Sequence, residues 1–164
     1  MTIAIAIIAA VALQRLLELV WAQRNTARLR ARGATEVGAS HYPLIVLLHA
    51  AWLVSILIFL PLPVAISAVP LAAFLGLQLC RVWVLFTLGP YFTTRIISLP
   101  GAPLVRKGPY RYIRHPNYAV VIGEILTLPL VFGEVKVAIV FSLLNAAILT
   151  WRIRVEDAAL AARR

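Results

Sequence analysis

The sequence predicts an all-α integral membrane protein with five transmembrane helices. Of its 164 residues, 62% are hydrophobic and 13% are charged, which is about half the charged fraction of an average soluble domain. Five apolar segments each approach the roughly 20 residues that a helix needs to cross a bilayer. They cover residues 2–21, 43–60, 64–88, 116–132 and 135–151. We expect them to form a single membrane domain over residues 1–164.

Apart from Arg15 and Arg81 inside the segments and Lys136 on the other side, the basic residues follow the first, third and fifth segments. They are Arg24, Arg28, Arg30 and Arg32; Arg95, Arg106, Lys107, Arg111 and Arg114; and Arg152, Arg154, Arg163 and Arg164. Five spans place these three groups on one face, which the positive-inside rule makes cytoplasmic, with the N-terminus external. Membrane topology therefore accounts for the net charge of +10 better than nucleic-acid binding does.

Two connections between segments are expected to be tight turns. Residues 61–63, Pro-Leu-Pro, separate the second and third segments, and Gly133 and Glu134 separate the fourth and fifth. Proline and glycine are the strongest local breakers of helices. The two longest polar stretches, residues 22–42 and 89–115, are then on the same side of the membrane, where a water-soluble cofactor would bind.

Four ionisable residues lie inside the apolar segments: Arg15, Glu18, Arg81 and Glu124. Each costs about 2.5 to 3.5 kcal/mol if it faces lipid, so we expect them to face protein, water or one another. Arg15 and Glu18 are three residues apart on one helix and can pair. Arg81 and Glu124 can pair between helices, or Glu124 can line a site.

Histidine and cysteine give little support for a metal site. His41 and His49 are eight residues apart and match no common spacing of zinc ligands. Cys80 is the single cysteine. A hydrogen-bonded packing role is the simpler interpretation of the two histidines, and we predict no metal.

Residues 108–124, GPYRYIRHPNYAVVIGE, place a basic loop at the start of the fourth apolar segment. Pro116 is expected to begin the helix, where its missing N–H needs no partner. The free N–H groups of a helix start suit an anionic group such as a carboxylate. Gly108 and Pro109 allow a tight turn and a close approach of ligand to backbone. The alternative is an ordinary turn, with arginine and tyrosine as interfacial anchors.

The end of the fifth segment, WRIRVED, carries a third cluster of polar residues. If the helix continues, Arg152 and Glu156 lie on one face, four residues apart, with Asp157 beside them. They can form a plain surface ion pair. Alternatively, the acidic pair binds hydroxyl groups or an amine while the arginine binds a carboxylate.

These motifs together resemble the isoprenylcysteine carboxyl methyltransferase family. The resemblance rests on GPYRYIRHPNY, on Gly123-Glu124, and on the terminal arginine followed by two acidic residues. The C-terminal half is also similar to membrane phospholipid N-methyltransferases. The resemblance implies a membrane methyltransferase that uses S-adenosyl-L-methionine and releases S-adenosyl-L-homocysteine. Its cofactor would lie in a cytosolic pocket over the C-terminal helical hairpin.

The resemblance also implies roles for particular residues. Those that match the cofactor pocket of the family are Gly108, Pro109, Tyr110, Arg114, His115, Pro116, Tyr118, Glu156 and Asp157. Arg152 matches the arginine that holds the acid group of the substrate. Asp157 replaces a second glutamate and is one methylene shorter, and Gly123 follows Tyr118 at a longer interval than the family's glycine does.

The N-terminal half looks like a short bacterial branch of the family, with members that O-methylate polyketide-derived lipids such as alkylpyrones. The residues expected to line the lipid side are Glu18, Arg24, Asn25, Glu36, His41, Tyr42 and His49. A carboxylate acceptor is already ionised, whereas a phenol or enol also needs a base. Glu124, His115 and His41 are the candidates for that base, and we expect Arg152, Glu124 and His41 to be catalytic.

We therefore expect an S-adenosylmethionine-dependent methyltransferase in a bacterial inner membrane, with its active site and C-terminus cytoplasmic. Its acceptor would be lipid-like, with methyl transferred to oxygen. One alternative is a phospholipid-type N-methyltransferase. The other is a small transporter or structural membrane protein with basic loops that contact anionic lipid.

Overall fold

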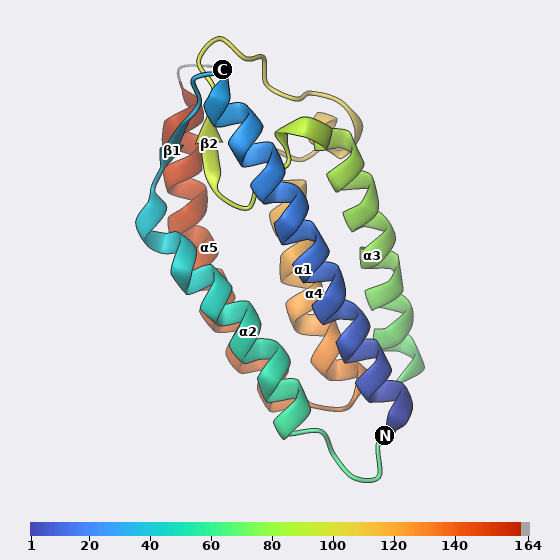
Figure 1. Ribbon diagram of the computed structural model, residues 1–164. Helices are drawn as coiled ribbons and strands as arrows, with labels where there is room; N and C mark the ends of the chain where they lie inside the picture. Colours follow the sequence, from blue (N-terminus) through green and yellow to red (C-terminus); the bar gives the residue numbers. More distant parts are fainter. Residues whose placement is uncertain (162–164) are drawn as a thin grey trace.

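Five helices running alternately up and down form the computed structural model, which describes residues 1–161 (Figure 1). They are α1 (Thr2–Ala31), α2 (Tyr42–Ile58), α3 (Ala68–Leu88), α4 (Pro116–Val131) and α5 (Val135–Leu160). Four are long and apolar enough to cross a membrane, while α4 is apolar but has 16 residues, about 24 Å at 1.5 Å per residue. The predicted class, an all-α integral membrane protein, is confirmed.

The C-terminal ends of α1, α3 and α5 lie at one end of the bundle (Figure 1). The basic groups that follow these helices therefore share that end, as the charge pattern predicts, except that Arg163 and Arg164 lie outside the described residues. Which side of the membrane this end faces stays a prediction.

The helix ends differ from the apolar segments in a systematic way. Both α1 and α5 continue about a further nine or ten residues past residues 21 and 151, because leucine, alanine and arginine there favour helix whether or not lipid surrounds them. The connection over residues 59–67 is longer than the predicted tight turn. The turn between α4 and α5 is tight, with Gly133 at a φ of 79°.

Two short strands were not predicted. The strand β1 (Thr35–Val37) pairs antiparallel with β2 (Ile96–Ser98), with Glu36 opposite Ile97. Strands of three residues are too short for an alternating pattern to be recognised in the sequence. Their pairing joins the two long polar stretches beside the C-terminal part of α5 (Figure 1).

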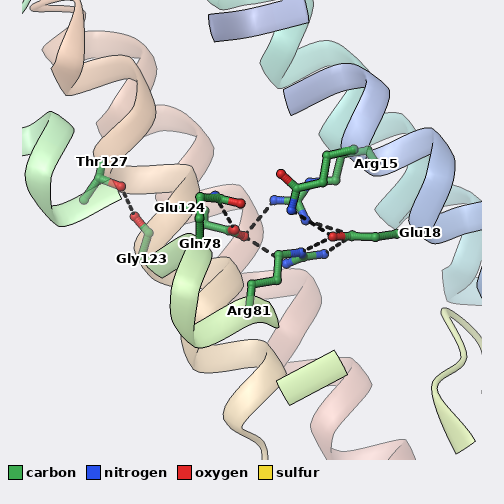
Figure 2. Close-up of polar contacts among 8 residues, drawn as sticks. Arg15, Glu18, Gln78, Arg81, Gly123, Glu124 and Thr127 are labelled. Atoms are coloured by element: carbon green, nitrogen blue, oxygen red, sulfur yellow. Dashed lines mark hydrogen bonds and ion pairs between the residues drawn. The ribbon is translucent and has the colours of Figure 1, made fainter. Parts of the chain in front are cut away.

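A network of buried charges joins α1, α3 and α4 (Figure 2). Arg81 of α3 donates to Glu18 of α1, at 2.6 Å from Nε to Oε1, and to Glu124 of α4, at 3.0 Å from Nη1 to Oε2. Arg15 of α1 contacts the same carboxylates, at 3.1 Å and 2.7 Å. Gln78 donates to the other oxygen of Glu124 at 2.8 Å. Both predicted ion pairs are confirmed, and the structure unites them.

Burial makes this network important for stability. Glu18, Arg81 and Glu124 are 7%, 6% and 1% exposed. Two arginines balance two glutamates, so the cluster carries no net charge into an apolar surrounding. Removal of one member leaves an uncompensated buried charge, which costs about 3 to 5 kcal/mol.

At the opposite end of the bundle, Glu134 lies in the turn between α4 and α5. Its side chain is buried, and neither carboxylate oxygen has a hydrogen-bond partner within residues 1–161. Burial of the charged form is unfavourable, and it raises the pKa of Glu134 from 4.5 to about 7. The carboxyl of Glu134 therefore stays protonated in the folded protein up to a higher pH than the carboxyl of an ordinary glutamate does.

We predict that Arg81→Leu strongly lowers thermal stability in detergent micelles, because Glu18 and Glu124 would then share only Arg15. The matched control is Arg24→Leu, which makes the same change at an exposed position of α1 and is expected to alter stability by no more than about 0.5 kcal/mol. Equal unfolding temperatures for the two variants would contradict the account.

We predict a pH dependence of stability that Glu134→Gln removes. Since the pKa of Glu134 is higher in the folded protein than its ordinary value, its stabilising contribution is complete below about pH 4.5 and is lost as the pH rises through about 7. Wild type should lose more thermal stability between pH 5 and pH 8 than Glu134→Gln does. Parallel curves for the two proteins would show that this carboxyl is not responsible.

Candidate functional site

A cavity of about 750 Å³ lies at the end of the bundle that carries the strands. Its wall includes Leu29 near the end of α1, side chains between Tyr91 and Arg106, and residues at the start of α4 and the end of α5. An apolar cluster adjoins the cavity, in which Ala22 of α1 and Leu85 of α3 pack with Phe92 of the cavity wall. The wall combines apolar surface with a concentration of charged groups.

The structure brings most of the predicted cofactor-pocket residues to this cavity. The wall contains Tyr110, Arg114, His115, Tyr118, Arg152 and Glu156. Gly108 and Pro109 begin the short helix η3 (Gly108–Arg111), Pro116 is the first residue of α4 as predicted, and Asp157 contacts His115. These residues come from two segments that are far apart in sequence and adjacent in the α4–α5 hairpin.

Arg152 is held firmly in the cavity wall. It is 6% exposed, its Nε donates to the Tyr118 hydroxyl at 2.7 Å, and its Nη2 donates to the carbonyl of Thr94 at 2.7 Å. Its Nη1 is buried and has no partner within the described chain. An unsatisfied buried donor of a charged group is costly, so this atom is a ready contact for an anionic ligand.

Tyr118 and His115 form the adjoining part of the site. The two rings stack with centroids 5.4 Å apart and planes at 20°, and the Tyr118 hydroxyl donates to Glu156. The His115 Nε2 lies 3.1 Å from Oδ1 of Asp157. The shorter aspartate side chain therefore still reaches the histidine. Burial and the nearby charge of Glu156 raise the pKa of Tyr110, which keeps that phenol neutral.

The cavity wall is strongly basic. Its charged residues are Arg95, Arg106, Arg111, Arg114, Arg152 and Glu156, so arginine outnumbers acid by five to one in the described wall. Glu36 partly offsets this from outside, since it pairs with Arg95 at 2.6 Å. The wall favours a ligand with negative charge.

Gly108 fixes the loop that enters the site. It has a φ of 54°, and a Cβ atom there would lie 2.6 Å from Oγ1 of Thr87 on α3. Only glycine accommodates both the left-handed conformation and this approach. The close contact seats η3 against the end of α3 and directs Tyr110 to the cavity.

Two residues expected to be catalytic lie outside the cavity wall. Glu124 belongs to the charge network within the bundle, where both of its oxygens are already bonded. His41 is 1% exposed and packs edge-on against Trp151, with ring centroids 5.6 Å apart. Of the three candidate bases, His115 is the one that lines the cavity.

The seven residues expected on the lipid side also lie outside the cavity wall. Asn25 holds the turn after α3, with its Nδ2 at 3.0 Å and 2.9 Å from the carbonyls of Gly89 and Phe92. His49 is a packing residue, with Nδ1 2.8 Å from the Ile45 carbonyl. Tyr42 stacks under Arg95, 4.0 Å from guanidinium carbon to ring centroid. Arg24 is exposed.

Sequence reasoning missed the contribution of residues 91–106. Phe92, Arg95 and Ile96 line the cavity, and the Thr94 carbonyl holds Arg152. No motif marks these residues. Their one signal is position, because they lie in the polar stretch 89–115 that was expected to hold a water-soluble cofactor.

The fold and the cavity define an α-helical membrane protein with a basic cavity at one end of its bundle. The model of the isoprenylcysteine carboxyl methyltransferase (ICMT) family matches residues 68–162. This is more than half of the chain, and the protein belongs to that family. The family is one of membrane methyltransferases, and its members use S-adenosylmethionine.

A curated relative extends the match over the N-terminal half. The chain is 40% identical over 158 residues to the uncharacterized protein YpbQ of Bacillus subtilis (strain 168), covering 94% of each chain. No solved structure gives a significant match. The similarity to this relative therefore includes the N-terminal half, whereas the methyltransferase class rests on the family match alone.

Proposed function

We propose that the protein is an S-adenosylmethionine-dependent membrane methyltransferase that acts on an oxygen of an anionic, lipid-like acceptor. The observation that carries the proposal is the buried Nη1 of Arg152, which has no partner in the described chain and lies in a wall that contains five arginines and one glutamate. Family membership supports the reaction class, and the position of the cavity in a membrane protein supports a lipid-like acceptor.

The residues of the cavity fit the cofactor. Its volume, about 750 Å³, is in the range of roughly 300 to 1,000 Å³ that small-molecule sites occupy. Glu156 suits hydroxyl or amino groups, and Arg114 suits a carboxylate. The side-chain oxygen of Asn117, also in the wall, is buried without a partner in the described chain and suits a ligand donor. The rings of Tyr110 and His115 offer faces on which an adenine can stack.

The bound cofactor supplies a methyl group on a positively charged sulfur, so the protein needs to position a nucleophile and exclude water. Arg152 would hold an anionic acceptor oxygen through Nη1, since Nε and Nη2 are already bonded to Tyr118 and Thr94. A carboxylate needs no further help. For a phenol or enol, His115 would accept the proton, with Asp157 holding the imidazole.

The phospholipid-type N-methyltransferase is less well supported. The reacting amine of such a phospholipid is protonated at neutral pH and must lose a proton before it can accept a methyl group. The Nη1 of Arg152, which has no partner within the described residues, suits an anionic oxygen better than an ammonium. This donor therefore favours transfer to oxygen.

We predict that S-adenosyl-L-homocysteine binds saturably to the purified protein, measured by calorimetry in detergent. His115→Ala should weaken binding tenfold or more, about 1.4 kcal/mol, because it removes the ring between Tyr118 and Asp157. Arg152→Ala should keep most of the affinity and lose turnover, since its free donor is assigned to the acceptor.

Arg24→Ala, at an exposed position of α1, is the matched control for handling and folding. This variant should bind S-adenosyl-L-homocysteine as tightly as wild type does. Absence of binding to folded wild type would favour a transporter or structural role. Wild-type affinity in His115→Ala would overturn the assignment of the pocket, and normal turnover in Arg152→Ala would remove Arg152 from the reaction.

A further inference from the structure

Two apolar side chains are exposed in the most basic loop of the protein. Tyr112 is 76% exposed and Ile113 is 52% exposed, and both lie between η3 and α4, outside the predicted apolar segments. Exposed apolar residues on the membrane helices are explained by contact with lipid. Two adjacent exposed apolar side chains in a loop indicate a surface that contacts a partner.

The same loop has a second side that forms the cavity. Tyr110 and His115 line the wall, while Tyr112 and Ile113, between them in sequence, are exposed. Gly108 is seated against α3, where its close neighbours are Thr87 and the indole nitrogen of Trp83. One side of the loop thus faces the site and the other is exposed.

Aromatic residues on α3 mark the level of this loop. Trp83 and Phe86 are 51% and 75% exposed near the end of α3. Tryptophan and tyrosine concentrate where a membrane meets water, with the ring at the headgroup level. Since a Cβ atom built on Gly108 would lie 3.3 Å from the indole nitrogen of Trp83, the loop begins beside this tryptophan, at the depth where an interfacial tryptophan would lie.

Exposed cations surround the two apolar residues. Arg106, Lys107, Arg111 and Arg114 are exposed, and none has an ion pair with an acidic side chain of residues 1–161. Arg111 lies 6.0 Å from the centre of the Tyr112 ring. Apolar side chains flanked by cations that lack an acidic partner within the described chain are the combination that binds a bilayer surface containing anionic lipid.

We propose that residues 106–114 form an interfacial segment that seats in one leaflet of the bilayer. Tyr112 and Ile113 enter the boundary between headgroups and acyl chains, and Lys107 contacts anionic phospholipid headgroups. Because the other side of the segment forms part of the cavity wall, contact with the bilayer holds that part of the wall in place. An amphiphile that diffuses in this leaflet reaches the basic rim of the cavity head first. Lipid contact by the segment does not depend on methyl transfer.

The test places a small thiol-reactive fluorophore at defined positions of the full-length protein in lipid nanodiscs. Tyr112→Cys and Arg32→Cys are made in a Cys80→Ser background, and the exposed native Cys80 on α3 labels the wild type as a reference within the membrane. Phosphatidylcholine with a nitroxide on its acyl chain quenches labels that lie close to those chains. We expect quenching at position 112 to approach that at Cys80, and little quenching at position 32.

The second arm compares nitroxide-bearing phosphatidylglycerol with phosphatidylcholine at equal mole fraction. Each basic residue near an anionic surface favours binding by a factor of about five. We therefore expect stronger quenching of position 112 by phosphatidylglycerol, a preference reduced severalfold by Lys107→Gln and absent at Cys80.

Two results would overturn the proposal. Quenching at position 112 no stronger than at position 32 would mean that water, a second copy of the chain or another protein covers this surface. Equal quenching by the two lipids would overturn the selection of anionic headgroups. Both readouts are independent of cofactor binding, so a failure of the proposed function would leave them unchanged.

Discussion

The arrangement of the bundle depends on the buried network of Arg15, Glu18, Arg81 and Glu124. In an apolar surrounding each of these charges is acceptable only beside its partners. The partners lie on α1, α3 and α4, so satisfying them fixes how these three helices face one another. Apolar contacts alone do not determine which face of a membrane helix turns toward the bundle, because lipid tails and apolar side chains offer similar contacts to leucine. The charges supply the specificity that apolar contacts lack.

The cavity follows from that arrangement. With α1 and α3 held together, Asn25 of α1 reaches the carbonyls after α3 and sets the direction of the chain that leads to β2. The Thr94 carbonyl on that stretch then holds Arg152 of α5. Tyr118 at the start of α4 bonds the other side of the same guanidinium. One guanidinium nitrogen has no partner within residues 1–161 and lies in a basic wall, and this donor is the centre of the proposed chemistry.

The sequence predicted the helices, and it grouped C-terminal residues that the structure places around one cavity, because both inferences rest on local patterns. Apolar length identified five helices, and the motif around His115 and Tyr118 pointed to residues that do meet at the cavity. Prediction from the sequence failed where the position of a side chain depends on contacts with residues far away in the chain. Glu124 and His41 carry suitable chemistry but face the interior of the bundle, and Arg95 lines the cavity although no motif marks it. A three-residue strand pairing such as β1 with β2 has no local signature at all.

The central claim is that this cavity transfers methyl groups to oxygen, and the most direct measurement identifies the atom that receives one. The protein would be incubated in vesicles of bacterial lipid with S-adenosylmethionine that carries an isotopically labelled methyl group. The labelled amphiphile would then be analysed by mass spectrometry and NMR. The account predicts label on the oxygen of an anionic amphiphile, and none with Arg152→Ala. Label on an amine nitrogen, or equal labelling by the variant, would contradict it.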